Sequence, residues 1–490
     1  MTAAAAVEGG ARPPTERVFV AGEWRPVATG ERYERRNPMR PAEVVYEEAS
    51  AGEADAAEAI GAAAAAFPAW AALPMARRGA YLLAAAAALE ARAADVSRDM
   101  ALEMGKPLRE ARLETARGAQ ILRYAASQAF LPVGERYEQA ASGAEVSTRR
   151  RPLGVVGLIT PWNFPCAIPT WKLAPALVLG NTAVLKLSRE APLTGLHLAA
   201  CFEEAGLPPG IINVLTGPGS ILGPALARDP RVAAVSFTGS VATGATVRDA
   251  CIRAGKRVQL ELGGHNPLIV TADADLARAA EAAYAGAFWS AGQKCTATRR
   301  IYVEESAYDE FRTLFLARVA RGKIGDPLDP EVEVGPIVSE AQLDEVAAAV
   351  ERGKAEGGRV AAGGERADSD GYLFAPTVFE DVGDSTFLSC EEVFGPVVSL
   401  YRFSTLDEAF ERANATRFGL SAAIFTSNLA TATRFQRELQ AGLLHVNSQT
   451  AGADIHVPFG GIKGSGFGPH EQGRAALEFY TDLVTIYVDA

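Results

Sequence analysis

Between residues 53 and 130 the chain carries the pattern of packed helices. Apolar side chains recur at spacings of three, four and seven residues and mark one helix face: Leu82, Leu83, Leu89, Val96, Met100 and Met104. The segment is rich in alanine, but leucine, tyrosine and arginine interrupt the alanine runs, which favours packed helices over a disordered tract. Residues 105–107 predict the end of one helix, and Leu108 begins the next.

After Arg151 short apolar runs alternate with helical stretches. Strands are predicted at 155–159, 183–187, 211–215, 232–237 and 258–262, with helices between them at 168–179, 193–205, 221–227 and 241–254. This alternation is typical of βαβ units in a parallel sheet with both faces covered. The sequence therefore predicts an α/β fold whose first half is a doubly wound, parallel-sheet nucleotide-binding domain.

A second alternating set begins near Leu268. Helices are predicted at 274–291 and 308–319, a strand at 300–303, and further strand-helix pairs between 397 and 446, whereas 327–336 and 357–370 are the most loop-like stretches. A second α/β domain therefore follows the first, with the boundary near residue 264. Residues 480–488 predict a last strand, which pairs either with residues 149–151 or with another subunit.

The composition indicates a globular protein of more than one domain. The chain has 490 residues, more than one core usually holds. With 48% apolar and 22% charged residues, it is not a disordered chain, a collagen or a small disulfide scaffold. The net charge of −11 argues against a nucleic-acid partner, because a phosphate backbone needs a basic face. Residues 149–151 are the only sharp basic cluster, and we interpret them as a solvated strand edge.

Cysteine and histidine usage indicates a reducing compartment and no metal. The five cysteines contain no CxxC pair, which fits a cytoplasmic protein with free thiols. The five histidines lie far apart without zinc spacing, so no metal site is expected. No apolar stretch of about 18 residues avoids charge, and residues 1–14 lack the order of a signal peptide, so no membrane partner is expected.

Two glycine-rich turns follow predicted strands. Residues 216–223 nearly match GxGxxG, but the last glycine comes one residue late. Residues 237–244 open a helix whose first N–H groups suit a pyrophosphate. Ala245 stands where a Walker A loop needs lysine, which weakens a kinase or ATPase interpretation. Each turn taken alone is equally well an ordinary strand-helix connection.

Three side chains stand out as candidates for chemistry. Cys295 lies in a polar, glycine-containing turn after a helix, where a thiol is reachable, so it is either a nucleophile or a structural residue. By contrast, Cys201 lies within a helix and is predicted to be buried. Glu261 ends a strand at the sheet edge where ligands bind, and partial burial would suit it as a general base. Asn163 is either an oxyanion donor or a turn cap.

Together these motifs resemble the aldehyde dehydrogenase superfamily, from about Phe19 to the C-terminus. Seven segments occur in the family's order: PWNFP at 161–165, Trp171-Lys172 with 175–177, FTGS at 237–240, ELGG at 261–264, GQKC at 292–295, EEVFGP at 391–396 and PFGG at 458–461. Cys295 lies 34 residues after Glu261, which is the separation that the family shows between base and nucleophile.

The resemblance implies a mechanism. Cys295 attacks an aldehyde to give a thiohemiacetal, while Asn163 and the Cys295 N–H hold the oxyanion. Hydride transfer to a nicotinamide leaves a thioester, which water activated by Glu261 hydrolyses to the acid, with Lys172 supporting the base. The implied substrate contacts are Phe164, Trp171, Thr296 and Phe459. The implied NAD or NADP contacts are Ile159, Thr160, Pro161, Trp162, Lys186, Ser188, Arg189, Gly219, Phe237, Gly239, Ser240, Thr243, Leu262, Glu392 and Phe394.

One position departs from the family pattern. After Lys186 the family often has a glutamate that takes the adenosine ribose hydroxyls, and here Arg189 stands in its place. An arginine can pair with a 2′-phosphate, so we expect NADP to be accepted or even preferred. In the alternative, Arg189 turns into solvent and NAD still binds.

Within the superfamily, residues 166–172, 292–298, 454–461 and 468–473 look most like bacterial alpha-ketoglutarate semialdehyde dehydrogenases. Trp171 stands where succinate semialdehyde dehydrogenases tend to have an arginine, and Lys294 is a weaker candidate for meeting a substrate carboxylate. A CoA-acylating semialdehyde dehydrogenase is a rival, although those relatives tend to lack Glu261. A non-catalytic binding protein that keeps the fold is the other rival, although Cys295 and Glu261 both remain.

The resemblance also implies domain limits and assembly. The dinucleotide-binding domain takes residues 1–132 and 153–264, and the catalytic domain takes residues 265–472. Residues 133–152 and 473–490 form an oligomerisation arm. A homodimer or a homotetramer is expected.

Overall fold

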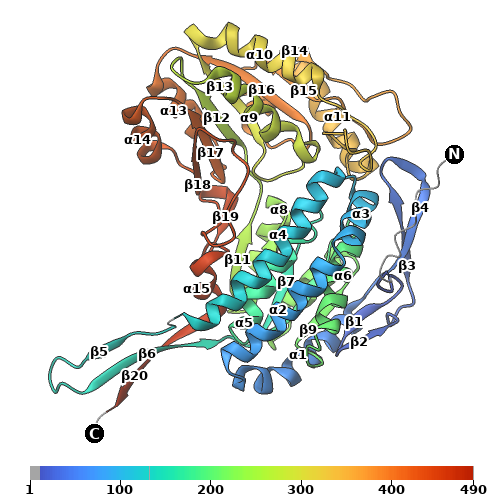
Figure 1. The fold of residues 1–490 in the computed structure, drawn as a ribbon, viewed down its shortest axis with the longest axis vertical. Helices are drawn as coiled ribbons and strands as arrows, with labels where there is room; N and C mark the ends of the chain where they lie inside the picture. Colours follow the sequence, from blue (N-terminus) through green and yellow to red (C-terminus); the bar gives the residue numbers. More distant parts are fainter. Residues whose placement is uncertain (1–11, 132, 489–490) are drawn as a thin grey trace.

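The described part of the protein consists of two α/β halves and a slender arm (Figure 1). The computed structural model describes residues 12–131 and 133–488. Residues 1–11, 132 and 489–490, which the predicted domain limits include, lie outside the described residues. The α/β fold class predicted from the alternating pattern is confirmed.

The first sheet has the strand order β19-β11-β10-β7-β8-β9-β1-β2. Its five central strands run parallel: β7 (Val155–Ile159), β8 (Thr182–Lys186), β9 (Ile212–Leu215), β10 (Val232–Thr238) and β11 (Arg257–Glu261). Each ends within one residue of its predicted bounds. Antiparallel strands complete the edges: β1 (Val18–Val20), β2 (Glu23–Arg25) and β19 (Gly466–Phe467).

Helices cover both faces of this sheet, as the doubly wound prediction requires. One face carries α1 (Glu53–Ala72), α7 (Gly219–Arg228) and α8 (Val241–Arg253). The other carries α2 (Met75–Ala91), α3 (Ala93–Met104), α4 (Leu108–Ser127), α5 (Ala167–Val178) and α6 (Pro192–Glu204). Strand β7 shows the alternation of side chains between the two faces. Val155 and Ile159 are buried on the face that α1, α7 and α8 cover, whereas Val156 and Leu158 are buried on the opposite face.

The second sheet has the order β14-β15-β16-β13-β12-β17-β18. Its strands are β12 (Asn266–Val270), β13 (Thr298–Glu304), β14 (Arg359–Ala362), β15 (Thr377–Glu380), β16 (Val397–Phe403), β17 (Ser421–Phe425) and β18 (Leu443–Val446). Its helices are α9 (Leu276–Phe288), α10 (Tyr308–Arg321), α11 (Glu340–Ala355), α12 (Phe387–Cys390), α13 (Leu406–Asn414) and α14 (Leu429–Glu438). The loop predicted over 357–370 is wrong at β14, because this short edge strand is only partly buried and gives little apolar pattern.

The arm is a three-stranded antiparallel sheet of β5 (Arg136–Glu138), β6 (Glu145–Pro152) and β20 (Thr481–Val488), which projects from the first half (Figure 1). Val484 pairs with Arg149 and Asp482 with Arg151, so the terminal strand pairs with the predicted arginine segment. A separate hairpin of β3 (Arg32–Asn37) and β4 (Arg40–Ala49) lies beside α3.

Strand pairing corrects two details of the predicted domain limits at the C-terminal end. The predicted catalytic range 265–472 contains β19, which pairs with β11 of the first sheet. The predicted arm range 473–490 contains α15 (Ala476–Tyr480), whose Phe479 and Tyr480 are buried in the first half's core. The chain returns to the first sheet before it enters the arm, and this long-range return leaves no local pattern. The other limits stay a prediction.

Among the described residues, no single helix is long and apolar enough to cross a membrane. Helices α1 and α2 meet that length and composition test only as a pair, with a bend of 119° between them. Short 3-10 turns lie at Gln128–Phe130, Trp289–Gly292, Glu305–Ala307, Lys463–Ser465 and Gly473–Ala475.

Candidate active site

A cavity of about 590 Å³ is lined by residues from both halves of the molecule. From the first half come the segments that follow β7, β10 and β11, so the cavity lies at the carboxyl ends of the parallel strands. From the second half come α11 and the segment after α12. Predicted site residues in the lining are Pro161, Trp162, Asn163, Gly239, Ser240, Leu262, Cys295, Glu392 and Phe394.

Cys295 follows a turn that an ordinary helix end would not produce. Ser290, Ala291 and Gly292 have φ angles of 58°, 52° and 67°, three left-handed residues in succession. A Cβ at Gly292 would lie 2.1 Å from the carbonyl oxygen of Gly395, so only glycine fits there. Cys295 is partly exposed, whereas Cys201 is buried, as the helix pattern predicted.

The surroundings of Cys295 favour its neutral thiol. Burial raises the pKa of Cys295 to about 12, and the carboxylates of Glu392 and Glu261 add to that rise. At neutral pH this thiol therefore needs a proton acceptor before it can act as a nucleophile.

Glu261 lies at the end of β11, with 3% of its surface exposed. Its Oε2 accepts a hydrogen bond from the Gly461 N–H at 3.3 Å. Burial raises its pKa well above the usual range, and the negative charge of Glu471 adds to that rise, while the positive charge of Lys172 opposes it. A carboxyl group with a raised pKa is suited to accept a proton near neutral pH.

A buried cluster stands behind Glu261. The Lys172 ammonium donates to Ser236 Oγ at 2.6 Å and pairs with the Glu471 carboxylate. Glu471 also accepts hydrogen bonds from Trp171 Nε1 at 2.7 Å and from Ser236 Oγ at 3.1 Å. Lys172 thus acts on Glu261 through its charge rather than through a hydrogen bond. Glu471 is not among the residues predicted from the sequence, although it stands within the segment 468–473.

Asn163 bridges the two sides of the cavity. Its Nδ2 donates to the Gln293 carbonyl at 3.0 Å, close to Cys295 in sequence. This contact uses one of the two Nδ2 hydrogens and leaves the other for a further acceptor. Asn163 Oδ1 is buried and has no hydrogen-bond partner within the described residues.

Glu392 and Phe394 line another part of the cavity. Glu392 accepts a hydrogen bond from the Gly264 N–H at 3.1 Å, and a Cβ at Gly263 would lie 2.0 Å from its Oε2. Burial raises the pKa of Glu392 to about 7. The ring of Phe394 meets that of Trp162 edge-on, with centroids 5.5 Å apart.

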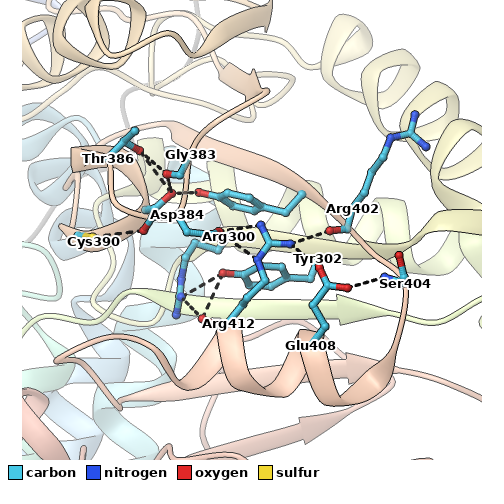
Figure 2. Close-up of polar contacts among 12 residues, drawn as sticks. Arg300, Tyr302, Gly383, Asp384, Thr386, Cys390, Arg402, Ser404, Glu408 and Arg412 are labelled. Carbon is cyan, nitrogen blue, oxygen red and sulfur yellow. Dashed lines mark hydrogen bonds and ion pairs between the residues drawn. The ribbon is translucent and has the colours of Figure 1, made fainter.

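A polar network anchors the turn that leads to Glu392 (Figure 2). Arg412 binds Asp384 Oδ1 at 2.7 Å and the Arg402 carbonyl at 2.7 Å, and thereby joins α13, β16 and the turn before α12. Cys390 donates from its thiol to the Asp384 carbonyl at 3.5 Å. Arg300, which is fully buried, donates to Tyr302 Oη at 3.2 Å and to the Arg412 carbonyl at 3.1 Å. The segment before Glu392 is therefore fixed to the second sheet.

The opening of α8 has the features of an anion site. Ser240 caps the helix by accepting from the Thr243 N–H at 3.4 Å. Thr238 Oγ1, at the cavity edge, is buried without a hydrogen-bond partner among the described residues. A dinucleotide's phosphates would satisfy such free N–H and hydroxyl groups.

Lys186 and Arg189 lie outside the cavity lining, at the end of β8. Burial lowers the pKa of Lys186 to about 8, and the nearby charge of Arg189 adds to that effect. Arg189 is exposed, and its guanidinium lies 4.1 Å from the centre of the Tyr33 ring. Gly219, at the start of α7, lies close to the Lys186 ammonium, because a Cβ added at Gly219 would lie 3.6 Å from Lys186 Nζ. Ser188 accepts from the Glu190 N–H at 3.3 Å.

The other predicted residues do not line this cavity. Ile159, Thr160 and Phe237 are buried in or beside the first sheet, and Thr243 is exposed in the first turn of α8. Phe164 lies under the Lys106 ammonium at 4.0 Å, and the rings of Phe459 and Trp171 are 5.5 Å apart. Thr296 is buried, and its carbonyl accepts from Thr450 Oγ1.

Lys294 points away from the cavity. Its Nζ donates to the Ala285 carbonyl at 2.9 Å, so it is not placed to meet a substrate carboxylate. In the part of the chain that the structure describes, no group of three or more histidine, cysteine, aspartate or glutamate residues is arranged to hold a metal ion.

Comparisons with known proteins give one answer. The sequence model of the aldehyde dehydrogenase family matches residues 24–486. Alpha-ketoglutaric semialdehyde dehydrogenase of Bacillus subtilis (strain 168) is 44% identical over 475 residues, which cover 96% of this chain and 97% of that protein. Betaine aldehyde dehydrogenase of Cereibacter sphaeroides (strain KD131) is 45% identical over 462 residues, 94% of this chain and 92% of that protein.

Solved structures agree. An NAD-dependent aldehyde dehydrogenase from Sinorhizobium meliloti superposes with a TM-score of 0.94 at 37% identity, covering 96% of this chain and 94% of that one. An NADP-dependent enzyme of E. coli superposes with a TM-score of 0.95 at 34% identity, covering 97% and 98%. Sequence and structure together place the chain, over nearly its whole length, in the aldehyde dehydrogenase family.

Proposed function

We propose that this protein oxidises an aldehyde to a carboxylic acid with NAD or NADP, with Cys295 as the nucleophile. The observation that carries the proposal is the setting of the Cys295 thiol. It lies in one cavity with Asn163 and with the turn that opens α8, and the carboxylates of Glu261 and Glu392 are near enough to raise its pKa.

The cavity has the donors and acceptors that a nicotinamide dinucleotide needs. The unpartnered Thr238 hydroxyl and the N–H groups at the start of α8 suit the phosphates. Glu392 suits a ribose hydroxyl, and Phe394 and Trp162 provide apolar walls. When bound there, the nicotinamide would supply the hydride acceptor.

In this mechanism the chain's own residues handle the thiol, the oxyanion and the water. The Cys295 thiol releases its proton to solvent water as its sulfur bonds to the aldehyde carbon, and the carbonyl oxygen of the substrate takes hydrogen bonds from Asn163 Nδ2 and the Cys295 N–H. Loss of hydride from that carbon leaves a thioester. Glu261 takes a proton from the water that attacks the thioester, which frees the acid and the thiol. Burial raises the pKa of Glu261, the charge of Glu471 adds to that rise, and the charge of Lys172 opposes it.

For the substrate we propose a short aldehyde that carries a carboxylate, of the alpha-ketoglutarate semialdehyde type. The name of the Bacillus subtilis relative supports this, as do the segments 166–172 and 454–461. The name of the Cereibacter sphaeroides relative favours a different substrate, the cationic betaine aldehyde. The two substrates carry opposite charge, so their relative kcat/KM decides between them.

For the cofactor we propose that NADP is accepted along with NAD. Arg189 lies where a glutamate would repel the 2′-phosphate, and Lys186 is a second positive group close by. The ring of Tyr33 holds the guanidinium in place. If Arg189 instead turns into solvent, NAD remains the better substrate.

The arm is our candidate for assembly into a homodimer or homotetramer. Strand β20 is an edge strand and exposes large apolar side chains: Leu483, Tyr487 and Val488 are 58%, 64% and 56% exposed. Edge strands with such side chains are ready to pair with another chain. A mass measurement in solution, with the arm variant Leu483→Lys as a comparison, tests this.

The first experiment is a rate measurement on the purified chain without CoA. Formation of reduced NAD or NADP is followed with four substrates: alpha-ketoglutarate semialdehyde (2,5-dioxopentanoate), betaine aldehyde, an aliphatic aldehyde and an aromatic aldehyde. Turnover to the free acid supports the proposal, and the cofactor ratio tests the role of Arg189. Turnover that requires CoA favours the acylating alternative. Absence of turnover with and without CoA favours a non-catalytic role.

A further inference from the structure

The turn before Cys295 stores backbone strain. Ser290 and Ala291 are not glycines, yet both have left-handed conformations, with φ, ψ of 58°, 30° and 52°, 33°. For such residues the left-handed conformation is unfavourable, because the Cβ crowds the backbone. It persists only where surrounding contacts hold it. Because Cys295 follows within a few residues, the position of its thiol depends on those contacts.

Glu110 provides the contacts at Ser290. It lies in the first turn of α4, and its Oε1 accepts from the Ser290 N–H at 3.1 Å, while its Oε2 accepts from Ser290 Oγ at 2.6 Å. Ser290 is 3% exposed, so water does not replace these bonds readily. Hydrogen bonds to a carboxylate are stronger than those between neutral groups.

Glu114, one helical turn further along α4, holds the opposite wall of the site. Its Oε1 accepts from the Cys166 and Ala167 N–H groups at 2.9 and 3.1 Å. Its Oε2 pairs with Lys106, whose ammonium also donates to the Asn163 carbonyl at 2.6 Å. Helix α4 therefore contacts both the segment that carries Asn163, through Glu114, and the segment that carries Cys295, through Glu110.

We propose that Glu110 is a positioning residue for Cys295, and that Glu110 and Glu114 together set the position of the thiol relative to the Asn163 amide. This proposal rests on the proposed nucleophilic role of Cys295. A displacement of about 1 Å at a reacting group is enough to cost on the order of 100-fold in rate. The contact between Asn163 Nδ2 and the Gln293 carbonyl would loosen with the turn.

The test uses the full chain with Glu110→Gln and Ser290→Ala. Glutamine keeps one acceptor oxygen and loses the other together with the charge, whereas Ser290→Ala removes only the hydroxyl bond. We expect Glu110→Gln to lower kcat by roughly 10- to 100-fold, with the KM for cofactor and aldehyde changed by less than about threefold. Ser290→Ala should lower kcat less. Glu53→Gln is the matched control, an exposed first-turn glutamate of α1, and should leave kcat unchanged.

A second measurement does not require turnover. Iodoacetamide labelling, followed by mass spectrometry, compares Cys295 with Cys390, the other partly exposed cysteine. We expect Glu110→Gln to change the Cys295-to-Cys390 labelling ratio by threefold or more, and Glu53→Gln to leave it unchanged. Because the two bonds act on one residue, the losses from Glu110→Gln and Ser290→Ala should not add in the double variant.

The outcomes separate the two proposals. If folded Glu110→Gln retains both kcat and the labelling ratio, or if the losses add fully, the positioning role is wrong. If wild-type protein does not oxidise aldehydes but its labelling ratio responds to Glu110→Gln, the proposed function fails and the positioning role stands. If Glu110→Gln does not fold, Ser290→Ala decides by the same two readouts.

Discussion

The two ends of the proposed site are built in different ways. At the reacting end, defined by Cys295, Glu261, Lys172 and Glu471, the buried ion pair of Lys172 and Glu471 also orients Trp171, and Glu261 is buried beside their charges. At the Lys186 end, defined by Lys186 and Arg189, the arginine is exposed and lies against the ring of Tyr33.

This difference separates rate from selection. Lys172 and Glu471 are buried and paired, and Glu261 is buried beside their charges, so a change at the reacting end leaves a group unpaired or shifts a pKa, and the rate should fall steeply. An exposed arginine is replaced at little cost to the fold, so a change at the Lys186 end should alter which cofactor is preferred and leave the chemistry intact.

The largest effect is expected for Cys295→Ala. Loss of the nucleophile removes the covalent route, so kcat should fall by on the order of 10⁴ or more. Reduced-cofactor formation measures this, and Cys201→Ala serves as the control because that cysteine is buried in α6, in the core of the first half. Residual activity above a tenth of wild type would exclude Cys295 as the nucleophile.

Glu261→Gln should separate the two chemical steps. Without the base, thioester hydrolysis should slow by roughly 10²- to 10⁴-fold, while the first turnover still produces a burst of reduced cofactor. Rapid-mixing absorbance records the burst and the steady rate. Hydroxylamine attacks a thioester without help from a base, so it should restore turnover. A variant that loses the burst and the steady rate equally would mean that Glu261 acts before hydride transfer.

At the Lys186 end, Arg189→Glu should shift preference rather than rate. A carboxylate repels the 2′-phosphate and accepts ribose hydroxyls, so the ratio of kcat/KM for NADP to that for NAD should fall by about tenfold or more. The same ratio for Arg189→Gln should lie between the values for wild type and for Arg189→Glu. An unchanged ratio in Arg189→Glu would contradict the role of Arg189, and an equal fall with both cofactors would contradict the separation of rate from selection.

The local sequence pattern predicts the central strands of the first sheet better than it predicts edge strands and contacts between distant parts of the chain. The strands β7 to β11 follow continuous apolar runs between glycine and proline punctuation, so their bounds were predictable. Strand β14 is a short, partly buried edge strand with little apolar pattern, and the return of the chain at β19 depends on a partner strand, β11, far earlier in the sequence. Likewise, the motifs nominate Cys295 and Glu261, but the contacts of Glu471 and Glu110 join elements about 180 to 300 residues apart, which no spacing rule connects.

The smallest effect is expected for Glu392→Gln, seen in stability rather than in rate alone. The folded protein raises the pKa of Glu392 to about 7 from an ordinary value near 4.5. The folded state therefore binds a proton more tightly than the unfolded state, and this contribution to stability is present below about pH 4.5 and is lost as pH rises through 7. Glutamine keeps the acceptor for the Gly264 N–H and cannot ionise. Urea unfolding at pH 5 and pH 8 should show that the variant gains stability over wild type at pH 8, by on the order of 1 kcal/mol, and much less at pH 5. An equal difference at both pH values would mean that the Glu392 carboxyl does not titrate between them, and its burial beside the cavity would then carry no penalty.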